Sequence, residues 1–361
     1  MARKNIDTQA VKDLVKGSTE AVKDMFARSM SQAAATKGSV GVDIGNDAVK
    51  TVRLESFKDG RRLLGFGVEK VADRNYIDAL SKSLAKAGAT PDQAAAIAVS
   101  GQGVVSRYIE LPLMNKGDLE SSMRFEIEKY VPFALAEVAT DYAIVQELKD
   151  KAKMSVLIVA AKNDLVQKKT ELVRQIGMNL RAIDLDCLAL ANFFTEIVSS
   201  QKAGCVGLVN LGRTISNMNI LVDGYPYLSR DIFVGGDDIT KKLVETLEIE
   251  AAEAERLKRT PGARQKELYS LWDPVLNNLA AEVRVSLDYF EARMNKTVEQ
   301  VWITGGTSRL QGLVDYLHQL LGVEVRVMDY VDGLLCDEAV DRRVLKEEAD
   351  LLAIAMGLAL R

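Results

Sequence analysis

One pattern occurs twice in this chain and constrains its fold more than any other: a strand runs into a glycine turn and returns as a second strand. The first copy, SVGVDIGNDAVKTVRL, covers residues 39–54, and the second, CVGLVNLGRTISNMNILV, begins at residue 205. A third strand is predicted after each copy, at residues 63–71 and 225–234. Such internal repetition predicts two related structural units in one chain.

The second copy has features that suit a phosphate group. A glycine turn lets main-chain N–H groups approach a phosphate with no Cβ in the way. Gly235 and Gly236 then begin a predicted helix, whose N-terminus would add its dipole to the same site. We interpret residues 205–236 as a phosphate-binding hairpin; the alternative is an ordinary β-meander, because glycine hairpins are common.

The duplicated plan resembles the actin-like ATPase superfamily, in which two related domains clamp the phosphates of a nucleotide between opposed hairpins. The stretch VWITGGTSRLQGL, residues 301–313, adds a buried strand that runs into Gly305 and Gly306 and then a helix. In that superfamily this arrangement brings the backbone against an adenine ring. The resemblance implies an α/β fold of two duplicated, ribonuclease-H-like domains.

Composition excludes several other classes of protein. The net charge is −4, with 47 basic and 51 acidic residues well mixed, so we expect no nucleic-acid binding. His318 is the only histidine, which excludes His-rich metal sites and Ser-His-Asp triads. Three dispersed cysteines favour a reducing compartment over a disulfide framework. No apolar stretch approaches the roughly 20 residues of a bilayer span, so we expect a cytoplasmic protein.

Residues 1–38 form a separate N-terminal segment, in which AVKDL at residues 10–14 recurs as AVKDM at residues 21–25. Their apolar side chains share one face of a predicted amphipathic helix, and a small, polar linker follows at residues 31–38. A membrane-surface helix usually carries an excess of Lys and Arg, whereas acidic and basic residues balance here. We therefore favour packing on a partner or on its own domain over membrane binding.

Between the two copies, residues 106–185 have the predicted order β-α-β-β-α-β, which we expect to form a subdomain inserted into the first domain. This segment resembles the cell-division protein FtsA and, much more closely, the type IV pilus assembly protein PilM family. Later stretches such as GYPYLSRDIFVGGDDITKKL and AIAMGLALR match that family in order, so the resemblance covers about residues 39–361. The residues of the insert that carry it are Glu126, Glu128, Tyr130, Pro132, Phe133, Asp141 and Tyr142.

The resemblance implies a division of the chain into four parts. An N-terminal helix and linker, residues 1–38, precede a first actin-like domain at 39–204, which holds the insert at about 106–185. A second actin-like domain follows at residues 205–335. The C-terminal segment, residues 336–361, is expected to return to the first domain.

The resemblance also implies ATP and Mg²⁺ between the two domains. The expected ATP-binding residues of the first hairpin are Asp43, Gly45, Asn46, Asp47 and Lys50, and those of the second are Asn210, Gly212, Arg213, Thr214 and Ser216. On the nucleoside side they are Gly235, Gly236, Glu255, Lys258, Gly305, Gly306 and Ser308.

Three of these assignments have alternatives. Asp43 is expected to hold Mg²⁺ through water, because Mg²⁺ keeps most of its waters; otherwise it caps its own turn. Lys50 lies on the returning strand, where it reaches a phosphate or faces solvent. Glu255 and Lys258 lie three residues apart on one predicted helix face, where they meet ribose hydroxyls or form an exposed ion pair.

One residue limits the expected chemistry. Asn210 stands where actin-like ATPases usually place an Asp, and an amide cannot order a magnesium-bound water as a carboxylate does. No position in the sequence marks a base for the attacking water. We therefore expect nucleotide binding, with ATP either hydrolysed very slowly or used as a structural ligand.

The resemblance implies a cytoplasmic adaptor of type IV pilus assembly, recruited to the inner membrane by the cytoplasmic tail of a PilN-like protein. The tail is expected in a groove between the first domain and its insert, near Glu126, Glu128 and Asp141, although the two glutamates also fit a solvated helix face. Other pilus proteins and further copies of this chain are possible partners. The alternatives are an FtsA-like membrane-associated filament protein and a sugar or acetate kinase, although those kinases lack such an insert.

Overall fold

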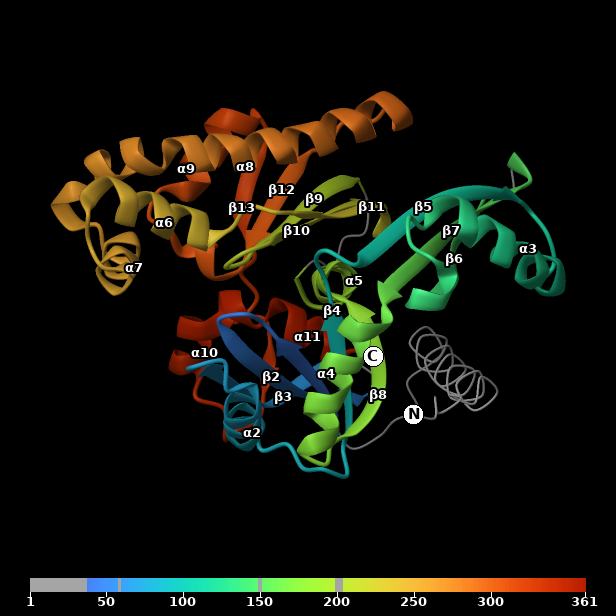
Figure 1. Ribbon diagram of the computed structural model, residues 1–361, viewed down its shortest axis with the longest axis horizontal. Helices are drawn as coiled ribbons and strands as arrows, with labels where there is room; N and C mark the ends of the chain where they lie inside the picture. Colours follow the sequence, from blue (N-terminus) through green and yellow to red (C-terminus); the bar gives the residue numbers. More distant parts are fainter. Residues whose placement is uncertain (1–37, 58–59, 149–150, 199–203) are drawn as a thin grey trace, which may run out of the picture.

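The computed structural model describes residues 38–57, 60–148, 151–198 and 204–361. These residues form a six-stranded, a five-stranded and a three-stranded sheet (Figure 1). The predicted N-terminal helix and linker, residues 1–38, lie outside the described residues apart from Gly38. Within the described chain, no helix is both long and apolar enough to cross a lipid bilayer.

The six-stranded sheet has the order β14-β3-β2-β1-β4-β8. Strands β1, β2 and β3 form an antiparallel meander, and β4 and β8 extend the sheet in parallel from β1. β1 and β4 are buried along nearly their whole length, which explains why both are apolar runs without alternation. The elements are β1 Ser39–Ile44, β2 Ala48–Phe57, β3 Gly60–Lys70, α2 Tyr76–Ala87, β4 Ala94–Val99 and β8 Asn179–Leu185.

The C-terminal part of the chain also packs on this sheet. Strand β14, Leu335–Cys336, pairs with β3, and helix α11, Ala353–Ala359, packs across β1. The helix approaches so closely that a Cβ on Gly41 would lie 2.0 Å from the Ala355 carbonyl oxygen. Strand β14 and helix α11 thus belong with the six-stranded sheet. Two short elements, α10 Arg342–Glu348 and a turn of 3-10 helix at Ala349–Leu351, lead into α11.

The five-stranded sheet, of order β11-β10-β9-β12-β13, repeats the plan of the first. An antiparallel meander of β9, β10 and β11 is extended in parallel by β12 and β13. This second meander confirms the predicted repeat. The elements are β9 Cys205–Leu211, β10 Ser216–Val222, β11 Tyr225–Ile232, α6 Gly236–Leu247, α7 Ala251–Arg259, α8 Gln265–Met294, β12 Gln300–Thr304, α9 Leu313–Leu321 and β13 Glu324–Val327, with 3-10 turns at Gly262–Arg264 and Gly306–Arg309.

The three-stranded sheet, of order β5-β7-β6, forms the insert. Helix α3, Lys116–Tyr130, packs Leu119, Met123 and Ile127 into a small core with this sheet. The strands are β5 Val104–Pro112, β6 Val138–Leu148 and β7 Lys153–Lys162, and a 3-10 turn at Leu135–Glu137 precedes β6.

The insert is shorter than predicted. The segment expected to form it, residues 106–185, includes α4 Asn163–Gln175 and β8, but β8 pairs in parallel with β4 of the six-stranded sheet. Helix α4 packs against β8 and β4 as well as β7. The predicted order of elements is correct, whereas its last strand completes the larger sheet, because β8 is an apolar strand that gains burial on both faces there.

Helix α5, Asp186–Phe193, connects the two larger sheets. It follows β8 directly and packs against α11 on one side and against β10 and β11 on the other. A wider π-type turn at Phe194–Val198 ends it. Its first residues consequently lie where the first domain, the insert and the second domain meet.

Candidate functional site

The turns of the two meanders touch each other. Asn46 Nδ2, in the first turn, donates a hydrogen bond of 2.9 Å to Thr214 Oγ1 in the second. Arg213 Nη1 lies 2.6 Å from Asp47 Oδ1, and Arg213 Nε lies 2.8 Å from Asp237 Oδ1. Partial burial would lower the pKa of Arg213, but the two carboxylates outweigh it and raise that pKa above its usual value. The structure thus brings together the two hairpins that the sequence predicted to face one cleft.

The tips of both turns carry unbonded main-chain donors. Among the described residues, no acceptor is bonded to the main-chain N–H of Asn46, Asp47, Arg213 or Thr214. The first turn is closed behind its tip by a bond of 3.1 Å from the Gly45 N–H to the Ala48 carbonyl. Successive free N–H groups in a turn form a concavity that attracts an anion. The pair of tips therefore offers four main-chain donors that an anion can use.

Asp43 and Lys50 face each other across the first hairpin. They are register partners on β1 and β2, and Lys50 Nζ lies 3.0 Å from Asp43 Oδ2. Both side chains are largely buried, so Lys50 points to Asp43 rather than to solvent. A Cβ on Gly45 would lie 2.8 Å from Lys50 Nζ, so the ammonium group lies close to the turn. The site therefore offers one carboxylate and one ammonium group side by side.

The start of helix α6 differs from the expected phosphate site. Its first N–H groups are already bonded: Gly236 N donates to the Gly212 carbonyl at 3.0 Å, and Gly235 N donates to Asp238 Oδ2 at 2.8 Å. A Cβ on Gly235 would lie 2.4 Å from the Arg213 carbonyl oxygen. This helix end therefore supports the second turn from behind, and its amides are not free for a ligand.

Lys258 and Glu255 do not form an exposed ion pair. Lys258 is 8% exposed, and its ammonium group donates to Glu255 Oε1 at 2.6 Å, to Thr240 Oγ1 at 2.8 Å and to the Gly236 carbonyl at 3.0 Å. Burial would raise the pKa of Glu255, but the bonds from Lys258 and Thr240 outweigh it and lower that pKa. The pair thus fixes α7 against the start of α6, and the half-exposed Glu255 is the member that can still meet a ligand.

Gly305 and Gly306 lie beside this corner. Gly305 has φ 92° and its Cβ would lie 2.5 Å from the Leu211 carbonyl oxygen, so only glycine fits there without strain. Ser308 turns inward and donates to the Gly305 carbonyl at 2.7 Å. Thr307, which the sequence did not indicate, donates to the Gly212 carbonyl at 3.0 Å. The expected nucleoside residues are therefore adjacent to the second hairpin, with main chain lining the space between them.

Asn210 is held in one orientation by its neighbour. Its Nδ2 donates a hydrogen bond of 3.0 Å to Asn217 Oδ1, and these residues are register partners on β9 and β10. Ser216, which follows the turn, is fully buried and donates to the Val234 carbonyl at 2.8 Å. Neither side chain points freely into solvent.

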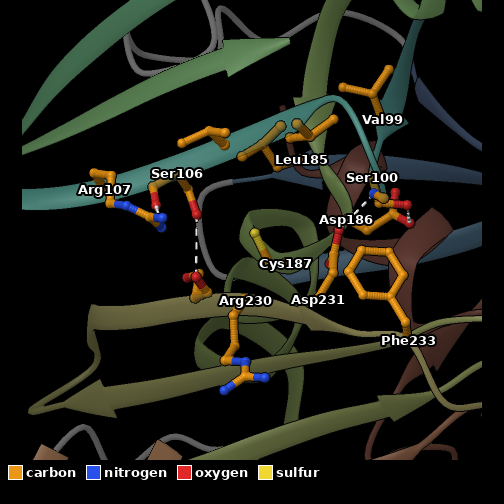
Figure 2. A pocket seen from close by; sticks show the side chains of 14 residues that line it. Val99, Ser100, Ser106, Arg107, Leu185, Asp186, Cys187, Arg230, Asp231 and Phe233 are labelled. Atoms are coloured by element: carbon orange, nitrogen blue, oxygen red, sulfur yellow. Dashed lines mark hydrogen bonds between the residues drawn. The ribbon is translucent and has the colours of Figure 1, made fainter. Parts of the chain in front are cut away.

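A cavity of about 150 Å³ next to the hairpins was not indicated by the sequence. It lies where β4, β5, α5 and β11 meet, and Figure 2 shows Ser100, Asp186 and Asp231 together on its wall. Ser100 Oγ donates to Asp186 Oδ2 at 2.6 Å, while Asp186 Oδ1 is buried and has no hydrogen-bond partner in the described chain.

Asp186 has the properties of a proton acceptor. Burial raises its pKa to about 6, although the nearby Lys169 acts in the opposite direction and Asp43 adds to the increase. A carboxyl group that titrates near neutral pH is well matched to accept a proton. One signal could have identified it: Ser100 and Asp186 directly follow the parallel strands β4 and β8, and ligands bind beyond the carboxyl ends of such strands.

The residues expected to receive a peptide are not part of this cavity. Glu126 pairs with Lys129 at 2.6 Å on α3, and Glu128, two residues further on, points to another side of the helix. Asp141 lies on β6, where its Oδ1 accepts a hydrogen bond from the Tyr142 N–H. All three belong to the insert, but none of them lines the cavity.

Comparisons with known proteins agree with this architecture. A family model for the type IV pilus assembly protein PilM matches residues 41–361. A solved PilM-PilN type IV pilus biogenesis complex is 24% identical, with a TM-score of 0.80 over 91% of this chain and 99% of its own. The ethanolamine utilization protein EutJ from Carboxydothermus hydrogenoformans is 16% identical, with a TM-score of 0.54 over 96% of this chain and 98% of its own. The predicted actin-like α/β fold is confirmed.

Proposed function

The chain belongs to the type IV pilus assembly protein PilM family, and from that membership we propose that it is an ATP-binding adaptor that holds the tail of a membrane protein. ATP with Mg²⁺ binds between the two hairpins. The partner is the cytoplasmic N-terminal tail of a PilN-like inner-membrane protein, which recruits the chain to the inner face of that membrane. The observation that carries the nucleotide part is the direct contact of two turn tips, Asn46-Asp47 and Arg213-Thr214, whose main-chain N–H groups have no hydrogen-bond partner among the described residues.

The residues around the cleft fit each part of ATP. The turn-tip amides and the Arg213 guanidinium suit phosphate oxygens, because guanidinium groups bind phosphates with strong charge-assisted hydrogen bonds. Asp43 suits a magnesium ion held through water, since Mg²⁺ takes few protein carboxylates. Glu255 suits ribose hydroxyls, and the main chain at Gly305 and Gly306 suits the flat face of adenine. A bound Mg²⁺ would neutralise phosphate charge at this position.

The nucleotide acts mainly as a ligand that sets the angle between the domains. Asn210 presents an amide where a carboxylate would help to order water, and its NH₂ group is committed to Asn217. A ligand that contacts both hairpins stabilises the closed arrangement by mass action.

Slow hydrolysis of ATP is a second candidate function, and one observation favours it. The unpartnered Asp186 Oδ1 lies on the wall of the cavity, in a carboxyl group whose pKa is raised to about 6 by burial. Such a group can accept a proton from water at neutral pH. If Asp186 has this role, Asp186→Asn abolishes any phosphate release without weakening ATP binding.

The insert supplies the peptide site. β5, one edge of the three-stranded sheet, packs against β11 of the second domain, and β6, the opposite edge, also contacts β11 and α4. An extended peptide can add to an open sheet edge through main-chain hydrogen bonds while alternate side chains enter pockets. Asp141 lies on β6, and Glu126 and Glu128 lie on α3 of the same insert, where Glu126 pairs with Lys129; these carboxylates suit basic residues of a juxtamembrane tail. Phe125 on α3 is 67% exposed and adds an apolar contact.

Titration of the full chain with peptides tests this proposal. Synthetic N-terminal tails of the pilus inner-membrane proteins encoded in the same genome are added with and without ATP, and binding is followed by calorimetry. We expect saturable binding of one tail, weakened by Glu126→Lys/Glu128→Lys. The matched control, Glu171→Lys/Glu347→Lys, reverses two exposed helical glutamates elsewhere and should have no effect. Failure of every tail to bind would contradict the adaptor role. If Glu126→Lys/Glu128→Lys leaves the affinity for the tail unchanged, the tail binds at a site other than α3.

A further inference from the structure

A chain of partly buried hydrogen bonds connects the second hairpin with the first domain. Asn210 Nδ2 donates to Asn217 Oδ1 at 3.0 Å, and Asn217 Nδ2 donates to Asp231 Oδ1 at 2.7 Å. The other oxygen of Asp231 accepts the main-chain N–H of Gly101 at 2.5 Å. Gly101 lies between β4 and β5, at the point where the insert begins. Four residues thus join the nucleotide side of the second domain to the base of the insert.

A second set of hydrogen bonds lies beside the first, between the same strands β10 and β11 and strand β5, and no bond among the described residues joins the two sets. Ser229 Oγ donates to Asn219 Oδ1 at 2.6 Å and lies 3.0 Å from the hydroxyl of Tyr108 on β5. Ser106 Oγ, also on β5, donates to the Ser229 carbonyl at 3.2 Å. Asn219 Nδ2 donates in turn to the Cys187 carbonyl at the start of α5. Strand β5 is therefore held by β11 through side-chain hydrogen bonds (Figure 2 shows Ser106 and its bond).

Three of these side chains are buried, whereas Asn210 and Asp231 are partly exposed. Asn217 is 3% exposed, Asn219 is not exposed, and Ser229 is 6% exposed. A buried donor or acceptor that loses its partner bears the full cost of its desolvation, so the bonds are kept or exchanged together. A joint exchange of such bonds between two arrangements would transmit a change between distant sites.

We infer that this network, centred on Asp231, couples the nucleotide site to the insert, so that ATP at the second hairpin changes how firmly β5 is held. The inference rests on the proposed function and specifies its regulation. Asp231 is a positioning residue: it contacts neither ligand in this arrangement, but it orients Asn217 and thereby Asn210 on one side and holds Gly101 on the other. Because coupling between two sites is reciprocal, a tail bound to the insert must change the affinity for ATP by the same factor.

Hydrogen exchange of the full chain with and without ATP·Mg²⁺ tests the inference. We expect ATP to slow amide exchange both at the hairpin tips and in β5, by about fivefold or more in β5, which is the lower end of common coupling factors. In Asp231→Asn, one of the two donors facing residue 231 loses its acceptor. ATP should still bind this variant, with a Kd within about threefold of that of the unaltered chain, and should still slow amide exchange at the hairpin tips. In β5, however, ATP should slow exchange by less than about twofold.

Two further variants complete the test. Arg230→Ala alters the neighbouring residue on β11, whose partner is Glu282 on α8 outside the network, and should behave as the unaltered chain. Ser229→Ala removes the hydroxyl that links Asn219 to Tyr108 on β5, while the bond from Ser106 to the Ser229 carbonyl remains. Because it loosens β5 from β11, it should reduce the effect on β5 even if Asp231→Asn fails to fold. Two results would overturn the inference but not ATP binding. In the first, ATP slows amide exchange at the hairpin tips but not in β5 of the unaltered chain. In the second, ATP slows exchange in β5 equally in the unaltered chain, in Asp231→Asn and in Ser229→Ala. Absence of ATP binding would overturn the proposed function as well.

Discussion

Thr214 accepts a hydrogen bond of 2.9 Å from Asn46, although 168 residues separate them in the chain. The contact joins the turn of one meander to the turn of its repeat. Beside it lie four main-chain N–H groups without a hydrogen-bond partner among the described residues, and the ion pair of Arg213 with Asp47. The nucleotide proposal and the predictions below follow from this arrangement.

Arg213→Ala should weaken ATP binding more than it affects stability. The Arg213 pairs are about half exposed, so they contribute at most about 1 kcal/mol to folding. A guanidinium bound to phosphate contributes more, and its loss should raise the Kd for ATP about tenfold. Calorimetry and thermal unfolding measure the two effects. The control is Arg256→Ala, which removes an exposed, ion-paired arginine from α7. If both variants weaken ATP binding equally, Arg213 does not contact the phosphates.

Asn210→Asp should destabilise the chain by about 1–3 kcal/mol, because the new carboxylate cannot donate to Asn217 Oδ1 and two acceptors then face each other. If the missing carboxylate is what limits hydrolysis, the same change increases phosphate release. Unfolding by urea and a phosphate-release assay check the two effects separately.

Addition of Asp231→Asn to Asn210→Asp should recover much of the lost stability. In the double variant residue 210 is a carboxylate and residue 231 is an amide. The side-chain amide of Asn217 can then rotate by 180°, donate a hydrogen bond to the carboxylate at residue 210 and accept one from the amide at residue 231. The new amide at residue 231 still offers an oxygen to the Gly101 N–H. A double-mutant cycle should therefore show a favourable interaction of about 1–2 kcal/mol. Strict additivity would show that the hydrogen bonds do not act as one network.

Asp186→Asn should stabilise the chain at pH 7.5 but not at pH 4. Burial raises the pKa of Asp186 to about 6 from a usual value of 3.8. Between these values the folded chain keeps a proton that the unfolded chain has released, so Asp186 makes the folded state less stable as the pH rises from about 4 to 6. Above pH 6 its cost is on the order of 3 kcal/mol, which an uncharged amide avoids. Urea unfolding at both pH values measures this, and a variant less stable at both would contradict the assignment.

Much of the fold could be predicted because its signals are local. Strand β9 was predicted at residues 205–211, where the structure has it, since an apolar run and a following glycine define it without reference to the rest of the chain. Gly88 ends helix α2 in the left-handed conformation that favours glycine, which is an equally local signal. The repeat then identified the two meanders as related.

The errors and omissions involve residues that meet only in the folded chain. The end of the insert was misplaced because the partner of β8 is β4, about 85 residues earlier, and its pattern alone does not choose a sheet. Lys258 has the spacing of a surface ion pair, and its burial depends on how α7 docks on α6. Asp231 and Gly101 are 130 residues apart, so no motif connects them.

Calorimetric titration of the full chain with ATP tests the central claim most directly: the two hairpins form one nucleotide site that uses Asp43 to hold magnesium. With Mg²⁺ present, one ATP should bind per chain, and Asp43→Asn should raise the Kd about tenfold or more, whereas in EDTA the two proteins should differ little. Asp223→Asn, in the turn between β10 and β11, should bind as the unaltered chain. No binding at millimolar ATP, or equal affinity of the unaltered chain and Asp43→Asn in Mg²⁺, would contradict the claim.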